Sequence, residues 1–417
     1  MAISMRLGQC SMVKISDELI NKIKESNDIV SVISEYVELR KSSPQSPIWV
    51  GRCPFHDEKD GSFKVNEQTQ SFYCYGCGAG SKDVSSGSDV ISFIQDKEGL
   101  SFVDACEFLA NRAGIPFVME PPNPKIEQAK KEATSHNIRY FKNLWNPNNP
   151  DAVNALAYLR GRGLNDQTIR DFKLGLVPQD EIKYRNNIVD IAGKIAFPIV
   201  EVTNDPIKAA TLGMSYRLPQ NNPPEPKYKN DPTSPAFNKG HLLFGLNHAQ
   251  KEIRNKKEGI MVECYFGTMM LHQYGIKNVV STMGTMISED QIKLAKKYAK
   301  KWYILYDADD PGRNALFNRA LSKMLELGLE PWFAPLPEQE DPDEFIVRVG
   351  ADEFKKWLQD NAVPLLDYYV EKTLTEYERT IKEKQTAILK KIMPLLEHIN
   401  PYEKEVINSL VRKRLGL

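Results

Sequence analysis

The N-terminal quarter of the chain alternates between helical spacing of apolar residues and short extended runs. Apolar residues recur at helical spacing over residues 15–39, behind the capping candidate Ser16, and again over residues 89–115. Short aromatic runs such as "SFYCYG" lie between these helices and predict strands. The proline-rich residues 116–125 predict a stiff, extended linker. The pattern therefore predicts a first domain over residues 1–115, followed by this linker.

The next region mixes helical and extended patterns. Residues 126–145 predict a mixed-charge helix, and residues 152–178 predict two short helices around a glycine turn. Two strand-like runs follow, "KIAFPIVEV" and "TLGMSYRL". The irregular, proline-rich residues 219–237 are a candidate functional loop.

After Glu258, short apolar runs alternate with helical spans. The runs "GIMVE", "NVVSTMG", "WYILYDAD" and "PWFAPLP" have the length of strands, so the alternation predicts a parallel sheet covered by helices. Residues 364–417 are charged and predict a helical tail. We therefore expect a multidomain α/β protein, α+β overall, whose further domains cover residues 126–245, 246–363 and 364–417.

Composition and charge add three limits to this reading. The chain has 417 residues, 41% of them hydrophobic, which is enough for more than one core. Its 55 basic and 55 acidic side chains balance, so any site for a polyanion must be a local patch. No apolar run reaches the length of about 18 residues that a membrane helix needs, and no secretory signal is visible. We therefore expect a cytoplasmic protein without a membrane segment, whose residues 1–16 are a disordered start or a tag remnant.

A cluster of cysteines and one histidine indicates a metal site. Cys53 and His56 are separated by two residues, and so are Cys74 and Cys77. Each pair fits a tight knuckle that points two donors at one ion, and a hairpin between the pairs would bring the knuckles together. Three thiolates and one imidazole predict a closed, structural zinc ion, and we expect positive backbone angles at the neighbouring Gly76 and Gly78.

There are two alternatives to a zinc site. One is a chance grouping of buried cysteines with a histidine. The other is a redox cysteine pair, which is disfavoured because no thioredoxin-like pattern surrounds it. Cys106 lies on an apolar helix face and is expected to pack in a core. The residues around the knuckles suit either stacking on unpaired bases or the core of a small zinc fold: Phe63, Lys64, Phe72, Tyr73 and Tyr75.

Carboxylates follow two of the strand-like runs. Glu263 ends "GIMVE", and Asp307 with Asp309 ends "WYILYDAD". Because the carboxyl ends of parallel strands meet at one edge of a sheet, we expect the three side chains to converge there. Such a cluster selects Mg²⁺ or Mn²⁺, and Asp341 and Asp343 in "EDPDEF" are expected to join it.

The alternative for Asp307 and Asp309 is a helix cap before Pro311. Divalent ions held by carboxylates are the usual machinery for joining or cutting phosphodiesters. The acidic residues therefore indicate phosphoryl transfer without giving its direction.

In combination, these motifs resemble those of bacterial replicative primases of the DnaG type. The resemblance rests on "CPFHDEKDGSFKV", "FYCYGCGAG", "LLFGL", "VECYFG", "HQYGI", "STMGT", "YDADDPGRNA" and "EDPDEF", in that order, and runs from about Ile15 to Leu417. It implies an N-terminal zinc-binding domain and an RNA polymerase domain with a mixed, basic subdomain and a catalytic Toprim subdomain.

The resemblance also implies roles for particular residues. It implies zinc ligands at Cys53, His56, Cys74 and Cys77, catalytic carboxylates at Glu263, Asp307 and Asp309, and outer metal ligands at Asp341 and Asp343. It further implies that four basic residues hold template or nucleotide: Arg162, Arg217, Lys227 and Lys239. Without the resemblance, these four would be interpreted as ordinary surface charges.

The chain departs from the family pattern at two places. Where the family usually reads Glu-Gly-Tyr-Met-Asp, this chain reads "ECYFG", so Gly267 replaces an acidic residue of the metal site. Residues 81–89, "SKDVSSGSD", predict a flexible surface insertion. The family's C-terminal helicase-binding domain is not recognisable in the sequence.

The leading hypothesis is a DNA primase that makes short RNA primers on single-stranded DNA from ribonucleoside triphosphates. Zinc would be structural, Mg²⁺ or Mn²⁺ catalytic, and the replicative helicase a partner of the monomer. One alternative is a metal-dependent nuclease or topoisomerase-like enzyme, since Toprim sheets also serve those reactions. The other is a single-strand-binding or helicase-binding module that Gly267 has weakened catalytically.

Overall fold

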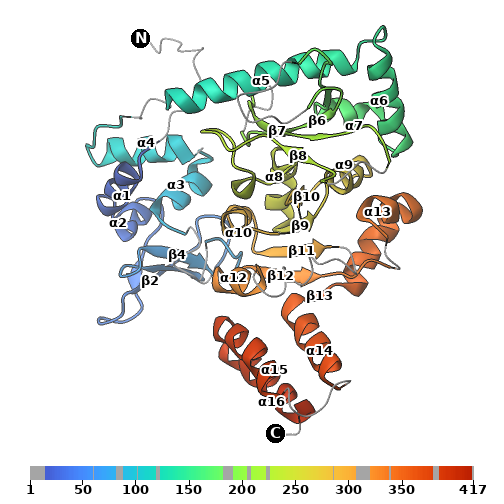
Figure 1. Ribbon diagram of the computed structural model, residues 1–417. Coiled ribbons are helices and arrows are strands. Elements are labelled where there is room, and N and C mark those ends of the chain that lie inside the picture. Colours follow the sequence, from blue (N-terminus) through green and yellow to red (C-terminus); the bar gives the residue numbers. More distant parts are fainter. Residues whose placement is uncertain are drawn as a thin grey trace, which may run out of the picture. The chain divides into compact units, whose positions relative to one another are not determined.

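The computed structural model describes the chain in two compact units, residues 1–123 and 124–417, which we treat separately (Figure 1). The described residues are 15–59, 61–80, 88–100, 102–118, 123–181, 191–203, 208–221, 226–284, 286–306, 320–337, 340–378 and 385–415. Within these ranges, no helix is both long and apolar enough to span a lipid bilayer.

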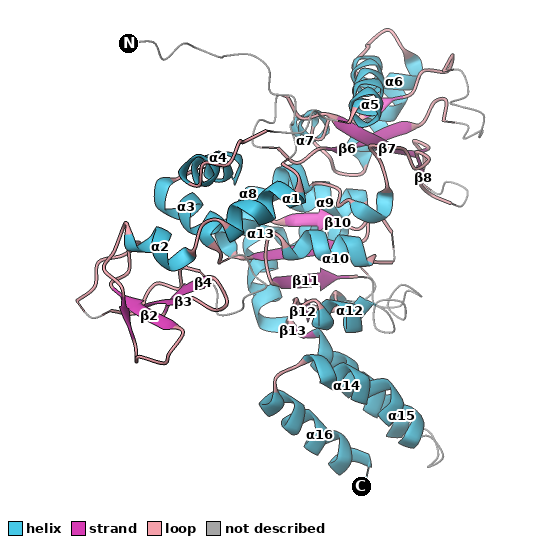
Figure 2. Cartoon of the chain, turned by 90° about the vertical axis from the view of Figure 1, so that its left-hand side faces the viewer, coloured by secondary structure: helices cyan, strands magenta, loops and turns pink. Residues whose placement is uncertain are grey.

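The first unit is a four-stranded sheet flanked by helices. Its elements are α1 (Asp17–Glu25), α2 (Ile29–Ser34), β1 (Arg40–Lys41), β2 (Ile48–Gly51), β3 (Phe63–Asn66), β4 (Ser71–Cys74), α3 (Val90–Glu98) and α4 (Phe102–Arg112). All neighbouring strands are antiparallel, in the order β1-β2-β3-β4 (Figure 2). The Ser16 hydroxyl accepts a hydrogen bond from the Leu19 amide, which confirms the expected cap of α1.

The second unit begins with a long helix packed on an antiparallel sheet. Its elements are α5 (Pro124–Leu144), α6 (Pro150–Gly161), α7 (Asp166–Asp171), β5 (Gly175–Leu176), β6 (Ile195–Val200), β7 (Thr211–Arg217) and β8 (Lys229–Asn230). The sheet order is β5-β6-β7-β8. Gly175 allows α5 to approach closely, because a Cβ there would lie 2.6 Å from the Tyr140 Cβ. The short strand β8 lies inside the segment that the sequence suggested was irregular.

A second sheet follows, and its first four strands are parallel, as expected. Its elements are η2 (Lys239–His241), α8 (Leu246–Lys256), β9 (Glu258–Val262), α9 (Tyr265–Gln273), β10 (Val279–Ser281), α10 (Glu289–Lys296), β11 (Lys301–Leu305), α12 (Leu321–Glu326), β12 (Glu330–Phe333), α13 (Pro342–Asn361) and β13 (Val363–Pro364). The order is β10-β9-β11-β12-β13, with the short edge strand β13 antiparallel. The sequence pattern did not indicate β13.

Both faces of this sheet are buried. Ile260 and Leu305 belong to one apolar core, and Met261 and Ile304, their neighbours in the strands, belong to another. Because successive side chains of a strand point to opposite faces, each strand contributes to both cores and reads as a continuous apolar run. The sheet is therefore the rigid element from which the residues at its strand ends project.

The chain ends in a helical region, as predicted. Its elements are α14 (Leu365–Glu378), α15 (Gln385–Ile392), η6 (Met393–His398) and α16 (Pro401–Leu415). Val370, Leu374, Val411 and Leu415 share the core that also contains Phe333 of β12. This region therefore packs on the sheet rather than extending from it as an independent tail.

Candidate functional site

The four residues expected to bind zinc come together in the first unit. One ligand atom from each of Cys53, His56, Cys74 and Cys77 lies within 4.8 Å of all the others. The Cys53 and Cys77 Sγ atoms are 3.7 Å apart, and the Cys74 Sγ lies 3.8 Å from the His56 Nδ1. Zinc–sulfur bonds of about 2.3 Å in a tetrahedron place two sulfurs about 3.8 Å apart. The donor set and its spacing fit a closed zinc site of three cysteines and one histidine.

Two backbone amides donate hydrogen bonds to the Cys74 sulfur, and the Ser62 hydroxyl oxygen lies beside it. The amides of Gly76 and Cys77 lie 3.3 and 3.4 Å from it, and the Ser62 hydroxyl lies 3.2 Å from it. Burial alone would raise the pKa of Cys74, but its contacts with Ser62 and with the amides of Cys77 and Gly76 outweigh burial and lower the pKa to about 7. The knuckle thus favours the thiolate, the form that binds metal.

Glu58 supports the cluster from behind, and the sequence reading missed it. Its Oε1 accepts the backbone amides of Cys53 at 2.6 Å and Ser62 at 3.0 Å. Its Oε2 accepts the Ser62 hydroxyl and lies 3.3 Å from the His56 Nε2, the ring nitrogen opposite Nδ1. A carboxylate at that nitrogen is the usual support of a metal-bound histidine. The only sequence signal was its position two residues after His56.

The two knuckle glycines differ in a way that corrects the expectation for Gly76. Gly78 has φ +73°, the left-handed conformation expected, and a Cβ there would meet no atom within 4 Å. Gly76 is not among the positive-φ residues; instead, a Cβ there would lie 2.6 Å from the His56 Nε2 and 2.9 Å from the Ser62 Oγ. Gly76 is therefore required by close packing and not by backbone conformation.

The aromatic residues near the knuckles divide between core and surface. Phe63 and Phe72 are fully buried, so for these two the core reading is correct. Lys64 and Tyr73 are paired across β3 and β4 on the opposite face of the sheet. The Tyr75 ring is 56% exposed, packs edge-on against Tyr73 at 4.9 Å, and lies 4.7 Å from the Lys64 Nζ. Lys64 and Tyr75 are exposed and Tyr73 is half-buried, so this trio keeps rings and charge that suit stacking on bases.

Glu263 lies where the sequence placed it, directly after β9. Val262 pairs with Leu305 of β11, so Glu263 and Tyr306 occupy the same edge of the parallel sheet. The Ser281 hydroxyl at the end of β10 donates a 2.8 Å hydrogen bond to the Glu263 carbonyl, which ties a third strand end to this edge. Asp307 and Asp309 follow Tyr306 in the chain but lie outside the described residues.

Lys239 is held beside Glu263. Its segment η2 is anchored by Gln291, whose amide nitrogen donates to the carbonyls of Lys239, Leu242 and Thr282. Burial lowers the pKa of Lys239, and the nearby Glu263 carboxylate partly opposes that effect. The lysine that the resemblance implied is therefore an electrostatic neighbour of the first carboxylate.

Asp343 is paired with Arg162, although the sequence analysis gave these two residues different roles. Asp343 stands in the first turn of α13 and is only 3% exposed, and its Oδ2 lies 2.8 Å from an Arg162 Nη2. Burial opposes the charge of Arg162, but the Asp343 carboxylate outweighs it and raises the pKa of the guanidinium above its usual range. The guanidinium also lies 4.3 Å from the centroid of the Phe266 ring. Asp341, which precedes α13, is half-buried.

The other two basic residues are in different environments. Arg217 is 5% exposed; its Nε donates to the Tyr158 hydroxyl at 3.0 Å, and its guanidinium lies 5.2 Å from the centroid of the Tyr228 ring. Lys227 is exposed, just before β8. Sequence reasoning missed Tyr158 and Tyr228, which position Arg217, because isolated tyrosines carry no pattern.

Gly267 lies where α9 approaches the start of α13. A Cβ on Gly267 would lie 3.1 Å from the Cys264 Sγ and 3.4 Å from the Pro342 Cβ. Cys264 caps α9, since its Sγ accepts the Gly267 amide at 3.2 Å. An acidic side chain at position 267 would therefore point from the helix start that follows Glu263 toward the segment carrying Asp343.

Two family models match the chain in the order of these sites. A model described as "CHC2 zinc finger" matches residues 15–124, and one described as "Toprim-like" matches residues 260–346. The first contains the zinc cluster, and the second contains Glu263, Gly267 and Asp343.

Known proteins are similar over nearly the whole chain. The DNA primase of Clostridium acetobutylicum is 31% identical over 435 residues, covering 97% of this chain and 68% of that protein. The DNA primase of Pseudomonas putida is 30% identical over 435 residues, and the match covers 96% of this chain and 62% of the Pseudomonas putida protein. The chain thus spans about two thirds of the length of these curated relatives.

Solved structures show the same architecture. A crystal structure of the zinc-binding and RNA polymerase domains of the Aquifex aeolicus primase is 28% identical, with a TM-score of 0.56, covering 97% of this chain and 98% of that one. A DNA primase domain from Pseudomonas aeruginosa is also 28% identical, with a TM-score of 0.59, covering 69% of this chain and 96% of that one.

Proposed function

The chain belongs to the bacterial DnaG-type primase family, and from this premise we propose that it synthesises short RNA primers on single-stranded DNA. The reaction is nucleotidyl transfer from ribonucleoside triphosphates to the 3′-hydroxyl of a growing primer. The observation that carries the proposal is Glu263 at the strand ends of a Toprim-like sheet, with Lys239 beside it and the Arg162–Asp343 pair at the adjoining helix start.

The site residues fit a divalent cation by their chemistry. Glu263, Asp307, Asp309, Asp341 and Asp343 would supply hard oxygen donors, which Mg²⁺ and Mn²⁺ prefer. A bound divalent ion supplies a more acidic primer hydroxyl and charge neutralisation at the reacting phosphate. We infer that Glu263, Asp307 and Asp309 are the chief ligands, with Asp341 and Asp343 outside them.

The basic residues have a separate task in this proposal. Lys239, next to Glu263, would bind a phosphate oxygen of the incoming triphosphate. Arg217 and Arg162 are held by Tyr158, Asp343 and the rings beneath them, so their guanidinium groups lose little rotamer freedom when phosphate binds. Lys227, exposed before β8, would contact template.

The zinc unit would hold the template. A zinc ion held by Cys53, His56, Cys74 and Cys77 would be structural, because four protein donors leave no open position for chemistry. The trio Lys64, Tyr73 and Tyr75 offers stacking and one cation, which suits unpaired bases. We further propose that the protein works as a monomer in the cytoplasm and that the replicative helicase is its partner.

The proposal is tested by primer synthesis on a mixed-sequence single-stranded template with four ribonucleotides and either Mg²⁺ or Mn²⁺. Glu263→Gln should reduce synthesis by at least about 100-fold, since it removes one charge from the site that neutralises the reacting phosphate. The matched control is Glu258→Gln at the opposite end of the same strand, where the carboxylate faces Lys301 and Tyr303.

Two results would contradict the proposal. Equal synthesis by Glu263→Gln and wild-type protein would remove Glu263 from the reaction. Cleavage of labelled DNA in Mg²⁺ without nucleotides would favour a nuclease.

A double variant tests the role of Gly267. Gly267→Asp together with Cys264→Gly removes the 3.1 Å contact with the Cys264 Sγ, and it should raise primer synthesis if the missing carboxylate limits activity.

A further inference from the structure

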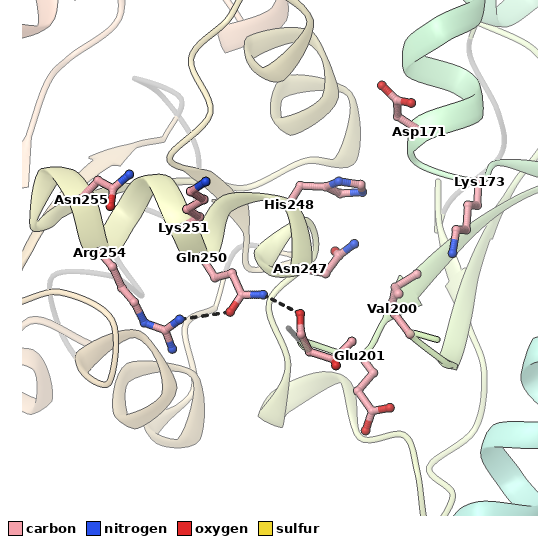
Figure 3. A pocket seen from close by; sticks show the side chains of 12 residues that line it. Asp171, Lys173, Val200, Glu201, Asn247, His248, Gln250, Lys251, Arg254 and Asn255 are labelled. Atoms are coloured by element: carbon pink, nitrogen blue, oxygen red, sulfur yellow. Dashed lines mark hydrogen bonds between the residues drawn. The ribbon is translucent and has the colours of Figure 1, made fainter. Parts of the chain in front are cut away.

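The second unit contains a hollow of about 570 Å³ that the proposed polymerase reaction does not use (Figure 3). One wall is the face of α8 that carries Asn247, Lys251 and Arg254, at helical spacing. The opposite wall is the end of α7, with Asp171, and the turn after it, with Lys173, and Figure 3 shows the His248 ring pointing from α8 toward that side. The volume is that of a typical small-molecule site.

Among the described residues that line this hollow, cations outnumber carboxylates. Among the salt bridges of the described residues, none involves Lys173, Lys251 or Arg254. Arg254 contacts only neutral groups in those ranges, the Gln250 amide oxygen at 3.2 Å and the Tyr298 ring at 4.7 Å. The hollow therefore presents three cationic side chains that no described ion pair compensates.

The two carboxylates of the hollow change this balance little. Glu201 is already paired, because the Lys130 Nζ lies 2.7 Å from its Oε1. Asp171 accepts a 2.7 Å hydrogen bond from the neutral Gln167, and among the described residues that line the hollow it is the one carboxylate left to oppose the three cations. Lys173 lies across the hollow from Lys251 and Arg254, so positive charge on both walls favours an anion bound between them (Figure 3).

Lys173 occupies a backbone conformation that lysine does not prefer. Its φ is +53°, at the position after α7 where the Leu174 amide returns to the Ile169 carbonyl. Glycine usually takes that position, and another residue there costs roughly 1 kcal/mol. The chain nevertheless has a lysine here, and its side chain lines the hollow.

The hollow is distinct from the strand-end site. His248 packs on Phe172 with ring centroids 4.5 Å apart, Phe172 packs on Phe244 at 5.5 Å, and Phe244 on Tyr265 at 4.8 Å. This row of rings stands between the His248 side chain and Tyr265, the residue two positions after Glu263. A ligand in the hollow therefore does not contact the carboxylates that would bind metal.

We propose that the hollow binds a small molecule carrying a di- or triphosphate group. Lys173, Lys251 and Arg254 contact the phosphate oxygens, and Asn247, His248 and Asn255 supply neutral hydrogen-bonding groups for the rest of the ligand. Free pyrophosphate and nucleoside triphosphates share this chemistry.

A nucleic-acid strand fits the hollow less well than a small ligand. A second hollow of about 440 Å³, lined by Lys130, Lys131 and Lys208, shares Ala209 with the first. A strand would have to cross from one to the other. The residues at that junction include Glu201 and Glu127, both engaged by Lys130 at 2.7 and 3.2 Å, so the path carries a network of ion pairs instead of free cations.

Calorimetric titration of the zinc-loaded full chain, without added Mg²⁺ or Mn²⁺, tests the proposal. The ligands are inorganic pyrophosphate, ATP, adenosine and a single-stranded oligonucleotide. Pyrophosphate or ATP should bind one to one, adenosine should not bind, and Lys173→Ala with Lys251→Ala should weaken binding at least about tenfold. Tighter binding of ATP than of pyrophosphate identifies a nucleotide site, and the reverse identifies a pyrophosphate site.

Matched variants separate this site from folding and from the polymerase site. Lys256→Ala, on the same helix but paired with Glu252, should bind like wild type. Lys173→Gly should weaken binding while raising the melting temperature, because it removes both the charge and the strained backbone. Glu263→Gln should leave binding unchanged. The proposal is overturned if the double variant binds as wild type, if Glu263→Gln abolishes binding, or if only oligonucleotide affinity falls.

Discussion

Replacement of Glu58 should loosen zinc without touching a zinc ligand. One carboxylate oxygen holds the amides of Cys53 and Ser62, at 2.6 and 3.0 Å, and the other faces His56 at 3.3 Å. Glu58→Gln keeps the first oxygen and removes the negative charge beside the imidazole. Glu58→Ala removes both supports, so both the Cys53 loop and the His56 ring become free to turn.

The expected sizes follow from these contacts. Loss of a carboxylate that supports a metal-bound histidine lowers metal affinity by about 10–100-fold. We expect the lower end for Glu58→Gln, because the two backbone hydrogen bonds persist, and the upper end for Glu58→Ala. Glu67→Gln is the control: its carboxylate serves Trp49 and Lys41 in the same unit and does not contact the cluster.

Competition with a chromogenic zinc chelator measures the affinity directly. The order should be wild type and Glu67→Gln, then Glu58→Gln, then Glu58→Ala. Equal zinc affinity in all four proteins would refute the argument that this carboxylate supports the cluster. A loss shared by Glu67→Gln would show that general destabilisation of the unit was being measured instead.

Three further predictions concern packing and charge. Gly76→Ala should lower zinc affinity at least about tenfold, because its Cβ would displace His56. Gly78→Ala should retain zinc and cost about 1 kcal/mol of folding stability. Equal zinc affinity of the two variants in the chelator competition would contradict this prediction. Burial raises the pKa of Asp231 to about 6, although its hydrogen bonds act to lower it. The folded state therefore binds this proton more tightly than the unfolded state does. Stability should fall as the pH rises from about 4 to 6. Asp231→Asn has no carboxyl group to titrate at this position. Its free energy of unfolding in urea, relative to that of wild type, should therefore be higher at pH 8 than at pH 5. The same difference at both pH values would be evidence against the raised pKa. Asp343→Asn should destabilise the protein by about 1–3 kcal/mol in urea, less than a fully buried pair because its arginine partner is partly exposed; a change below about 0.5 kcal/mol would mean the pair contributes little.

The sequence by itself determined the features that depend on local spacing. The paired ligands Cys53–His56 and Cys74–Cys77 needed only two short knuckles and a hairpin, so their spacing sufficed to predict the zinc site. The apolar runs 258–262 and 301–305 are buried on both faces, so their continuous hydrophobicity predicted parallel strands and placed Glu263 at a strand end. The family motifs added the names of residues whose roles no periodicity reveals.

Only the tertiary structure decided which distant residues meet. Arg162 and Asp343 are 181 positions apart, and their pairing depends on the fold bringing the residue after α6 to the first turn of α13, which neither local pattern encodes. The hollow beside α8 arises in the same way, from lysines on elements that lie far apart in the sequence. Local backbone preference and side-chain periodicity act over a few residues, whereas these contacts result from the packing of whole helices and sheets, which sets the distances between elements.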